Sequence, residues 1–344
     1  MYTVGIIGCG RIAKVHAEAI DRIDEFSIQG VCDIQPEKRD MFSSQYNTPA
    51  YSNFKELLEK EKPDLVVIAT PNGTHYPIAK ECFNKGFHVL LEKPIAIKME
   101  NSEELVALAE KSNLHFFAVK QVRYNPAIRI LKSAIDHGKL GKMLSSSLVV
   151  RWTRPQEYFD QTDWRGTKEQ DGGTLLNQGI HYVDIMQWLM GDAHTVFGKT
   201  ERCCHQIEIE DMAFGFIRYQ SGALGTLEFT INTYPRNMEC SITILGERGS
   251  VKLSGSAMNE IEIWEVKDTP KPVVPEGFPP YVYEGGLYQG SCPNHLFVYL
   301  DILKVFQGQD SSYVDGKEAL RSLRIVNGLY ESSRTGDPVV LKGF

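Results

Sequence analysis

The chain has 344 residues, 42% of them hydrophobic and 24% charged, and this length and composition favour two domains, each with a core of its own. Its net charge of -7 excludes a broad basic field, so we expect neither nucleic acid nor an anionic membrane as a partner, and local Lys and Arg must meet any anionic ligand. The seven cysteines are scattered without C-x-x-C spacing, so we expect reduced thiols and no metal site.

The first part of the chain alternates short apolar runs with helical stretches. The runs that resemble buried strands are Val4–Ile7, Ile28–Cys32, Leu65–Ala69, Val89–Leu91 and Phe116–Val119. This alternation predicts a parallel sheet covered by helices on both faces. The N-terminus runs straight into the first strand without a basic leader, and no apolar segment of membrane-spanning length follows. We therefore expect a cytoplasmic protein.

After Leu140 apolar and polar residues alternate one by one, most clearly in 212–219, 224–231 and 240–245. Such alternation is typical of an antiparallel sheet with two chemically different faces. The Pro- and Gly-rich stretch 270–290 indicates a long loop, and amphipathic helices are expected at 294–306 and 316–334. The fold class is thus α/β: a doubly wound N-terminal domain (1–120) and a C-terminal α+β domain (121–344) with a large open, mostly antiparallel sheet.

The first strand leads into a glycine-rich turn, Gly8-Cys9-Gly10-Arg11-Ile12-Ala13, and then a helix. Gly8 permits a tight turn, Gly10 lets the backbone approach a pyrophosphate, and Ala13 allows close packing of helix and strand. The second strand ends in Asp33, roughly 20 residues beyond the motif, as ribose recognition requires. The turn therefore predicts a Rossmann dinucleotide site, with Arg11 and Ile12 among its contacts.

Asp33 also predicts which dinucleotide binds. Its carboxylate would accept hydrogen bonds from the ribose hydroxyls and repel a 2′-phosphate, so NAD is expected rather than NADP. Lys38 and Arg39 follow closely; they fit a solvated helix face, although they leave a minor NADP activity open. A polar turn at the carboxyl edge of the sheet is expected to contribute further contacts from Thr70, Asn72 and His75, where the ring of His75 fits a plain helix start equally well.

Two further motifs carry polar groups suited to chemistry. The fourth strand ends in Glu92-Lys93-Pro94, which places a lysine at the ligand-binding edge. Much later, a Gly-Gly pair precedes a helical segment in which Asn177 and His181 are four residues apart and so share one face. Each motif alone also fits an ordinary charged turn or a core histidine, but together they indicate a site.

Together with the glycine-rich turn, these motifs resemble the glucose-fructose oxidoreductase/inositol dehydrogenase (Gfo/Idh/MocA) family, and the resemblance covers essentially the whole chain. Within that family, the chain is similar to the UDP-N-acetylglucosaminuronate 3-dehydrogenases, which oxidise a nucleotide-linked sugar acid during surface polysaccharide assembly. The stretches that carry this finer likeness are 152–160, 164–167, 171–173, 177–184, 209–211, 233–235 and 242–249.

The resemblance implies an NAD-dependent sugar dehydrogenase with Lys93, His181 and Asn177 as its catalytic group. His181 would take the proton from the sugar O3 and Lys93 would stabilise the alkoxide. Many family members carry Asp where this chain has Asn177, an uncharged side chain that orients a hydroxyl or holds Lys93; we interpret it as a mark of the subgroup. The remaining expected cofactor contacts are Glu92, Lys93, Gln121, Trp164 and Arg165.

A substrate with a diphosphate and a carboxylate needs a local cationic patch in an acidic protein. Arginines at 123, 151, 154 and 165 offer fork-shaped donors suited to such anions, and Arg154 and Arg165 are the strongest candidates. The expected substrate contacts are Lys93, Arg123, Tyr124, Asn125, Arg154, Tyr158, Arg165, Asn177 and His181.

Two other functions remain open from the sequence. A dehydrogenase of the same family for a free polyol or sugar, such as myo-inositol, would not need the arginines. A non-catalytic regulator that senses NAD would not need Lys93 and His181. Finally, an exposed sheet face with apolar members such as Phe214, Phe216, Leu227 and Phe229 predicts a homo-oligomer, as in the family, either a dimer or a tetramer.

Overall fold

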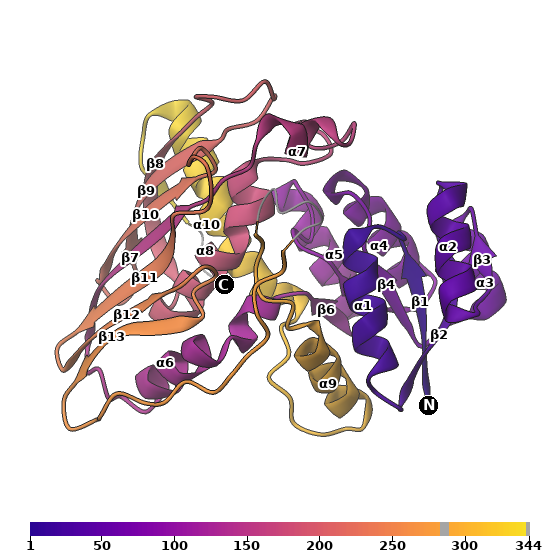
Figure 1. Cartoon of the computed structure of the whole chain (residues 1–344), viewed down its shortest axis with the longest axis horizontal. Coiled ribbons are helices and arrows are strands. Elements are labelled where there is room, and N and C mark those ends of the chain that lie inside the picture. The colour runs from indigo at the N-terminus through magenta and orange to yellow at the C-terminus, as the bar shows by residue number, and fades with distance from the viewer. Residues whose placement is uncertain (283–288, 342–344) are drawn as a thin grey trace. The chain divides into compact units, whose positions relative to one another are not determined.

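The computed structural model describes residues 1–282 and 289–341. The chain forms two compact units: the first contains Met1–Lys120 and His295–Leu320, and the second contains Gln121–Asn294 and the segment from Arg321 onward (Figure 1). Of the predicted loop 270–290, residues 283–288 lie outside the described part of the chain. Within the described ranges, no helix has both the length and the apolar character needed to span a bilayer.

The first unit contains a six-stranded parallel sheet in the order β3-β2-β1-β4-β5-β6. The strands are β1 (Tyr2–Ile7), β2 (Phe26–Cys32), β3 (Ala50–Tyr51), β4 (Leu65–Ile68), β5 (His88–Leu91) and β6 (Phe116–Ala118). The predicted parallel sheet is confirmed, and β3 is the strand that the apolar runs did not reveal. Because the order reverses direction between β1 and β4, the carboxyl ends of these two strands form the switch point where doubly wound sheets bind ligands.

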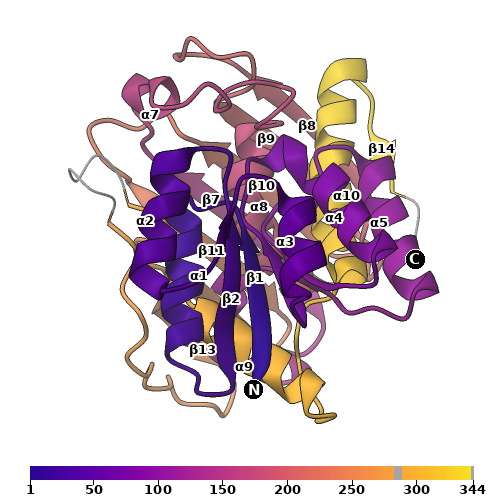
Figure 2. The ribbon, with the colours of Figure 1, turned by 90° about the vertical axis from the view of Figure 1, so that its right-hand side faces the viewer.

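Helices cover both faces of this sheet. They are α1 (Arg11–Asp21), α2 (Pro36–Tyr46), α3 (Phe54–Glu61), α4 (His75–Asn84), α5 (Met99–Lys111) and α9 (His295–Phe306), with a short 3-10 turn η1 (Asn72–Thr74) before α4. Figure 2 shows α1 and α2 on one side of the central strands and α3, α4 and α5 on the other. The helix α9 packs against α1.

Residues 295–320 group with the first unit, whereas the sequence placed them in the second domain. Two contacts explain why. The backbone of Ala118 donates to Val314 O at 2.8 Å, which extends the sheet edge, and the Tyr2 hydroxyl donates to Phe306 O at 3.0 Å. The ring of Phe306 also lies against Phe26 and Phe117, so this late segment completes the core of the first unit.

The second unit contains an eight-stranded sheet in the order β13-β12-β11-β7-β10-β9-β8-β14. The strands are β7 (Met143–Arg151), β8 (Ala193–Glu201), β9 (Met212–Tyr219), β10 (Leu224–Thr230), β11 (Glu239–Gly246), β12 (Gly249–Ser254), β13 (Glu260–Val266) and β14 (Val339–Val340). All neighbours pair antiparallel except β7 and β10, which pair parallel. The expected large, mostly antiparallel sheet is confirmed.

Within the described residues, helices cover one face of the second unit's sheet (Figure 1). The helices that contact the sheet are α6 (Pro126–Asp136), α8 (Ile180–Met190) and the later part of α10 (Gly316–Thr335). The segments that connect strands and helices contain three short turns of helix: η2 (Gln121–Tyr124), α7 (Gln156–Asp160) and the π-helical turn η3 (Leu175–Gly179). On the opposite face Phe214 and Phe216 are 48% and 62% exposed.

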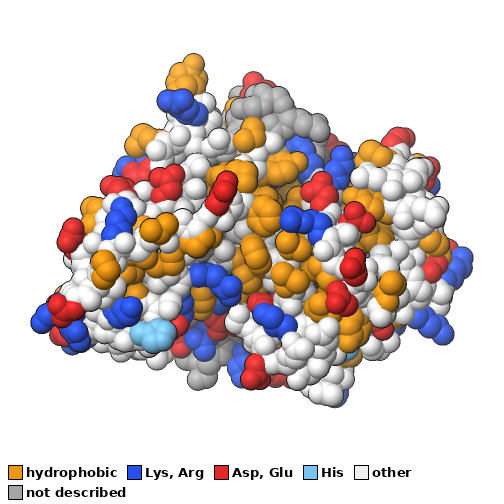
Figure 3. Space-filling model, turned by 60° about the horizontal axis from the view of Figure 1, so that its bottom comes forward, with side chains coloured by type: hydrophobic (Ala, Val, Ile, Leu, Met, Phe, Trp, Pro, Cys, Tyr) orange, Lys and Arg blue, Asp and Glu red, His pale blue; other side chains and the backbone are white. Residues whose placement is uncertain are grey.

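One part of the expected apolar face was wrong. Leu227 and Phe229 are 2% and 1% exposed, because Thr226 pairs with Phe216 and Glu228 with Phe214, which turns the odd-numbered residues of β10 toward the helices. Among the described residues of the sheet strands, the exposed large apolar side chains are Leu144, Phe197, Phe214, Phe216, Leu224, Leu245, Ile263 and Val340. On the face drawn in Figure 3, hydrophobic side chains are interspersed with both acidic and basic ones, so neither charge dominates there.

Candidate active site

The turn after β1 has the geometry that a pyrophosphate site requires. Gly8 has a φ of 94°, and a Cβ at this position would lie 2.6 Å from Ala69 O, so only glycine fits without displacing the backbone of the neighbouring strand end. Gly10 is the N-cap of α1 and, having no side chain, makes no capping bond to the amides at the start of the helix. Such amides, at the switch point of the sheet, suit the pyrophosphate of a dinucleotide.

Asp33 lies at the end of β2, beside this turn. One carboxylate oxygen accepts from the backbone N of Cys9 at 2.8 Å and the other from the backbone N of Gln35 at 2.8 Å. These bonds fix the carboxylate against the glycine-rich turn, and its half-buried position leaves part of it accessible to a ribose. Arg39, which left NADP activity open, pairs with Asp40 at 3.0 Å.

The polar turn after β4 is held by the fully buried ring of His75. Its Nδ1 lies 2.7 Å from Pro94 O and its Nε2 lies 2.9 Å from Thr70 O, and burial lowers the pKa of the imidazole. The Thr74 hydroxyl adds a 2.7 Å bond to that of Thr70. His75 therefore joins two loops of the switch-point edge, and we correct its expected direct contact with the cofactor.

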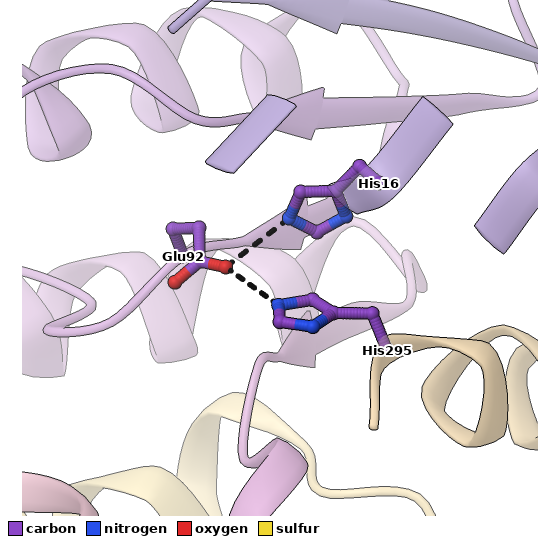
Figure 4. Close-up of side chains that lie close together, drawn as sticks. All are labelled: His16, Glu92 and His295. Carbon is purple, nitrogen blue, oxygen red and sulfur yellow. Dashed lines mark hydrogen bonds and ion pairs between the residues drawn. The ribbon is translucent and has the colours of Figure 1, made fainter. Parts of the chain in front are cut away.

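Glu92, also expected to contact the cofactor, is buried in a cluster with two histidines (Figure 4). Its Oε1 lies 3.1 Å from His16 Nε2 and 3.2 Å from His295 Nε2, while its Oε2 accepts from the backbone N of Lys93 at 3.1 Å. Burial alone raises the pKa of Glu92, but the hydrogen bonds from His16 and His295 outweigh it and hold the pKa well below its usual range. The carboxylate of Glu92 thus stabilises the turn that carries Lys93, by accepting a hydrogen bond from the Lys93 backbone N.

In the second unit, Asn177 lies on the π-helical turn η3, which leads directly into α8 with His181 in its first turn. Both side chains are buried, at 5% and 7% exposure. The sequence predicted an ordinary helix here; the π-turn is the difference, and such turns often occur at functional sites. Asn177 Nδ2 donates to Asp171 Oδ1 at 2.6 Å, and this bond fixes the orientation of the amide.

The start of this helix is held by Glu210. Its Oε1 accepts from the backbone N of Leu175 at 2.7 Å and from the Tyr330 hydroxyl at 2.8 Å. Burial raises the pKa of Glu210 to about 7 despite these bonds. Gly173, with a φ of 149°, is required because a Cβ would lie 2.0 Å from the Tyr330 hydroxyl oxygen. Asp171 and Glu210 lay in stretches that carried the family resemblance, but their supporting role became visible only in the structure.

Three of the expected substrate residues come together in the second unit. The guanidinium groups of Arg154 and Arg165 lie 5.8 Å and 4.2 Å from the ring centre of Tyr158, and Gln178 Nε2, next to Asn177, donates to the Tyr158 hydroxyl at 3.3 Å. The guanidinium of Arg165 also lies 5.5 Å from the ring centre of Trp164. This arginine–tyrosine cluster thus adjoins the helix that carries Asn177 and His181.

The two arginines differ in exposure. Arg154 is 4% exposed and donates to Thr153 O and to Gln289 O, at 2.6 and 3.2 Å. Arg165 is half-buried, donates to Tyr158 O at 3.0 Å, and lines a hollow of about 690 Å³ formed by residues from 156–167 and 202–208. Arg165 is therefore the better placed of the two to meet an anion.

Other expected substrate residues have structural partners. Arg123 forms a buried two-pronged ion pair with Asp184, at 2.6 and 2.9 Å, and Asn125 donates to Ala257 O while accepting from Asn294 Nδ2. Because both side chains are buried and hydrogen-bonded to other residues of the second unit, we remove Arg123 and Asn125 from the expected substrate contacts. Tyr124 is buried under Arg129, and Gln121 donates to Ser291 Oγ at 3.1 Å.

Comparison with known proteins identifies the family of the chain. The profile described as "Oxidoreductase family, NAD-binding Rossmann fold" of Gfo/Idh/MocA matches residues 2–120, and that of its "C-terminal alpha/beta domain" matches residues 132–341. The chain belongs to this family. The expected family and NAD cofactor are confirmed, and the chain is an NAD-dependent sugar dehydrogenase rather than a non-catalytic sensor.

Two solved structures are similar to this chain over nearly the whole length of both proteins. The WlbA dehydrogenase from Bordetella pertussis, in complex with NADH and UDP-GlcNAcA, is 34% identical with a TM-score of 0.90, covering 100% of this chain and 99% of that one. The WlbA dehydrogenase from Chromobacterium violaceum, with the same two ligands, is 36% identical with a TM-score of 0.91, covering 99% and 96%. Myo-inositol 2-dehydrogenase from Thermotoga maritima is 27% identical over 65% of this chain and 67% of its own length.

Proposed function

We propose that this dehydrogenase oxidises the C3 hydroxyl of UDP-N-acetylglucosaminuronate to the 3-keto sugar, as a step in surface polysaccharide assembly. The observation that carries the proposal is the full-length likeness, at 34% and 36% identity, to two dehydrogenases solved with NADH and UDP-GlcNAcA. The arginine–tyrosine cluster adds local support, because guanidinium forks suit the diphosphate and carboxylate of such a substrate.

In this mechanism the residues divide into a cofactor set and a proton-transfer set. Gly8, Gly10 and Asp33 hold NAD, which when bound supplies the acceptor for the hydride that leaves C3. His181 takes the proton from O3, and Lys93 stabilises the negative charge that develops on that oxygen. Asn177, oriented by Asp171, positions the sugar hydroxyl by hydrogen bonding without adding a charge.

A substrate panel tests the proposal. The purified protein is incubated with NAD and UDP-sugar acids, neutral UDP-sugars, polyols and free sugars, and the absorbance of NADH is followed. We expect UDP-N-acetylglucosaminuronate to be oxidised fastest, and substrate deuterated at C3 to pass its label to the cofactor. Retention of the label in the product would place the oxidation at another carbon.

The second candidate is a free polyol such as myo-inositol, which the Thermotoga relative favours. This substrate carries no charge, so its turnover would be insensitive to the arginines. Faster oxidation of myo-inositol than of any UDP-sugar acid would replace the nucleotide-sugar proposal.

We also propose that a second copy of this chain covers the open face of the eight-stranded sheet. Phe197 and Phe216 are neighbours across β8 and β9 and both are strongly exposed, which is unfavourable for large aromatic side chains in water. Light scattering at micromolar concentration should give a dimer or tetramer, and Phe216→Glu should shift the protein toward the monomer. A monomeric wild type would refute this interface.

A further inference from the structure

The carboxylate of Glu92 is buried and is surrounded by three hydrogen-bond donors, two imidazole N–H groups and one backbone N–H. Oε1 faces the Nε2 atoms of His16 and His295, and Oε2 faces the backbone N–H of Lys93. The Nδ1 of His16 lies 2.9 Å from the Tyr299 hydroxyl, which can donate to it when Nε2 carries the proton. His16 can therefore donate to Glu92 while neutral, whereas the buried Nδ1 of His295 has no hydrogen-bond partner among the described residues.

The cluster joins segments that are far apart in the sequence. His16 comes from α1, Glu92 follows β5, and His295 begins α9, the segment that returns to the first unit after the sheet of the second has been built. Glu92, His16 and His295 are 5%, 0% and 2% exposed. A buried carboxylate without such donors would be costly, so its partners fix both its charge and its position.

We propose that His16 and His295 are positioning residues that act on Lys93 through Glu92. The two imidazoles hold Glu92 Oε1, and Oε2 in turn holds the backbone N of Lys93. On the other side of Lys93, His75 contacts Pro94 O at 2.7 Å, so the turn is fixed at both flanks. This inference rests on the proposed role of Lys93, whose amine must reach the reacting oxygen; a displacement of about 1 Å can cost about 10²-fold in rate.

The same three ligand atoms lie within 4.8 Å of one another, a spacing that a metal ion could also bridge. Direct hydrogen bonds are favoured because both N···O distances fall at 3.1–3.2 Å and the second carboxylate oxygen already binds the backbone. Elemental analysis of the purified full-length protein should find no stoichiometric zinc or other transition metal. One ion per chain, lost in His295→Leu, would overturn the hydrogen-bonded network.

The kinetic test compares His295→Leu with His295→Gln, since the glutamine amide can place an N–H where Nε2 lies. We expect kcat to fall about 10- to 100-fold in His295→Leu and in Glu92→Gln, with KM for NAD changed less than about twofold. His295→Gln should recover kcat to within about threefold of the wild type. The matched control is His88→Leu, which removes a half-buried imidazole of β5 that bonds the backbone of His115 and should leave kcat unchanged.

Assays use whichever sugar the wild type oxidises fastest, so the test survives failure of the proposed substrate. Lys93→Met is measured in parallel: near-normal turnover in that variant refutes the catalytic assignment of the lysine and with it the positioning role. If Lys93→Met is inactive but His295→Leu and Glu92→Gln turn over normally, the positioning role alone is refuted. Melting temperatures identify losses due to unfolding, and a His295→Gln variant as slow as His295→Leu at equal stability would also overturn the proposal.

Discussion

Two glutamates, the buried Glu92 of the first unit and the half-buried Glu210 of the second, support the two proposed catalytic segments and differ in pKa. Glu92, beside Lys93, has donors on both carboxylate oxygens, and its pKa lies well below its usual range. Glu210, at the start of the segment with Asn177 and His181, receives its two closest donors on one oxygen, and burial raises its pKa to about 7. Burial raises the pKa of each, but at Glu92 the hydrogen bonds and charge interactions with His16 and His295 outweigh burial, whereas at Glu210 the bonds from Leu175 and Tyr330 do not.

The two segments should therefore respond differently to pH. The turn of Lys93 is held by a carboxylate that remains ionised at neutral pH, whereas the helix of His181 is held by a group that changes its charge near neutrality. The consequences can be tested in variants of each region.

The largest effect is expected when the two proposed catalytic side chains are removed. Lys93→Met and His181→Ala should each lose on the order of 10²-fold or more in kcat, because one removes the charge that stabilises the alkoxide and the other the proton acceptor. Calorimetry should find NAD binding largely intact in both. Near-normal turnover in one variant alone would mean that only the other region serves the chemistry.

The arginine–tyrosine cluster should affect binding more than turnover. Arg165→Ala should raise KM for the UDP-sugar acid by roughly 10- to 100-fold, since a charged hydrogen bond contributes about 1.5–3 kcal/mol. Arg154→Ala should raise KM less, because the guanidinium of Arg154 is 4% exposed and donates to two backbone carbonyls. Arg165→Lys should recover only part of the affinity, because lysine keeps the charge but loses the fork. Unchanged KM values in both alanine variants would remove the cluster from the substrate site.

In the first unit, Asp33 should set the cofactor preference. NAD should bind at least about tenfold more tightly than NADP, because the carboxylate would face the 2′-phosphate. Titration calorimetry of the wild type measures both constants. Equal or tighter binding of NADP would contradict the assignment and point to Lys38 and Arg39.

The comparison of the two glutamates predicts a smaller effect, on stability alone. The pKa of Glu210 is raised in the folded state, so above its ordinary value of 4.5 the unfolded chain releases its proton first and stability falls until the pH passes about 7. Glu210→Gln keeps the acceptor without the charge, so relative to the wild type its unfolding free energy should rise by about 1–3 kcal/mol between about pH 4.5 and pH 8. Denaturant unfolding at several pH values measures this; a difference independent of pH would show that Glu210 is ionised throughout.

The sequence determined the features that depend on local pattern. Apolar runs predicted five of the parallel strands, because strands buried on both faces consist mainly of apolar residues. Alternation of apolar and polar residues predicted the second sheet, because successive side chains of a strand point to opposite faces. Gly8 was recognisable from its place in the Gly8-x-Gly10-x-x-Ala13 motif, and the structure supplies the reason: its φ of 94° and its closeness to Ala69 O leave no room for a side chain. The spacing of Asn177 and His181 likewise indicated a shared segment, although the π-turn within it was not foreseen.

The partner that each polar side chain meets depends on long-range packing and could not be predicted from the sequence. Arg123 and Asp184 are far apart in the chain but form an ion pair in the structure. The sequence indicated that Arg123 could bind an anion, but it could not show that the guanidinium is already paired with a buried carboxylate. Leu227 and Phe229 were assigned to the wrong face because the register of β10 against β9 is set by strand pairing. His295 lies about 200 residues from Glu92 in the sequence, yet the two side chains are hydrogen-bonded. The contact forms because α9, which follows the second sheet in the chain, packs in the first unit. Such long-range packing produces no local pattern in the sequence.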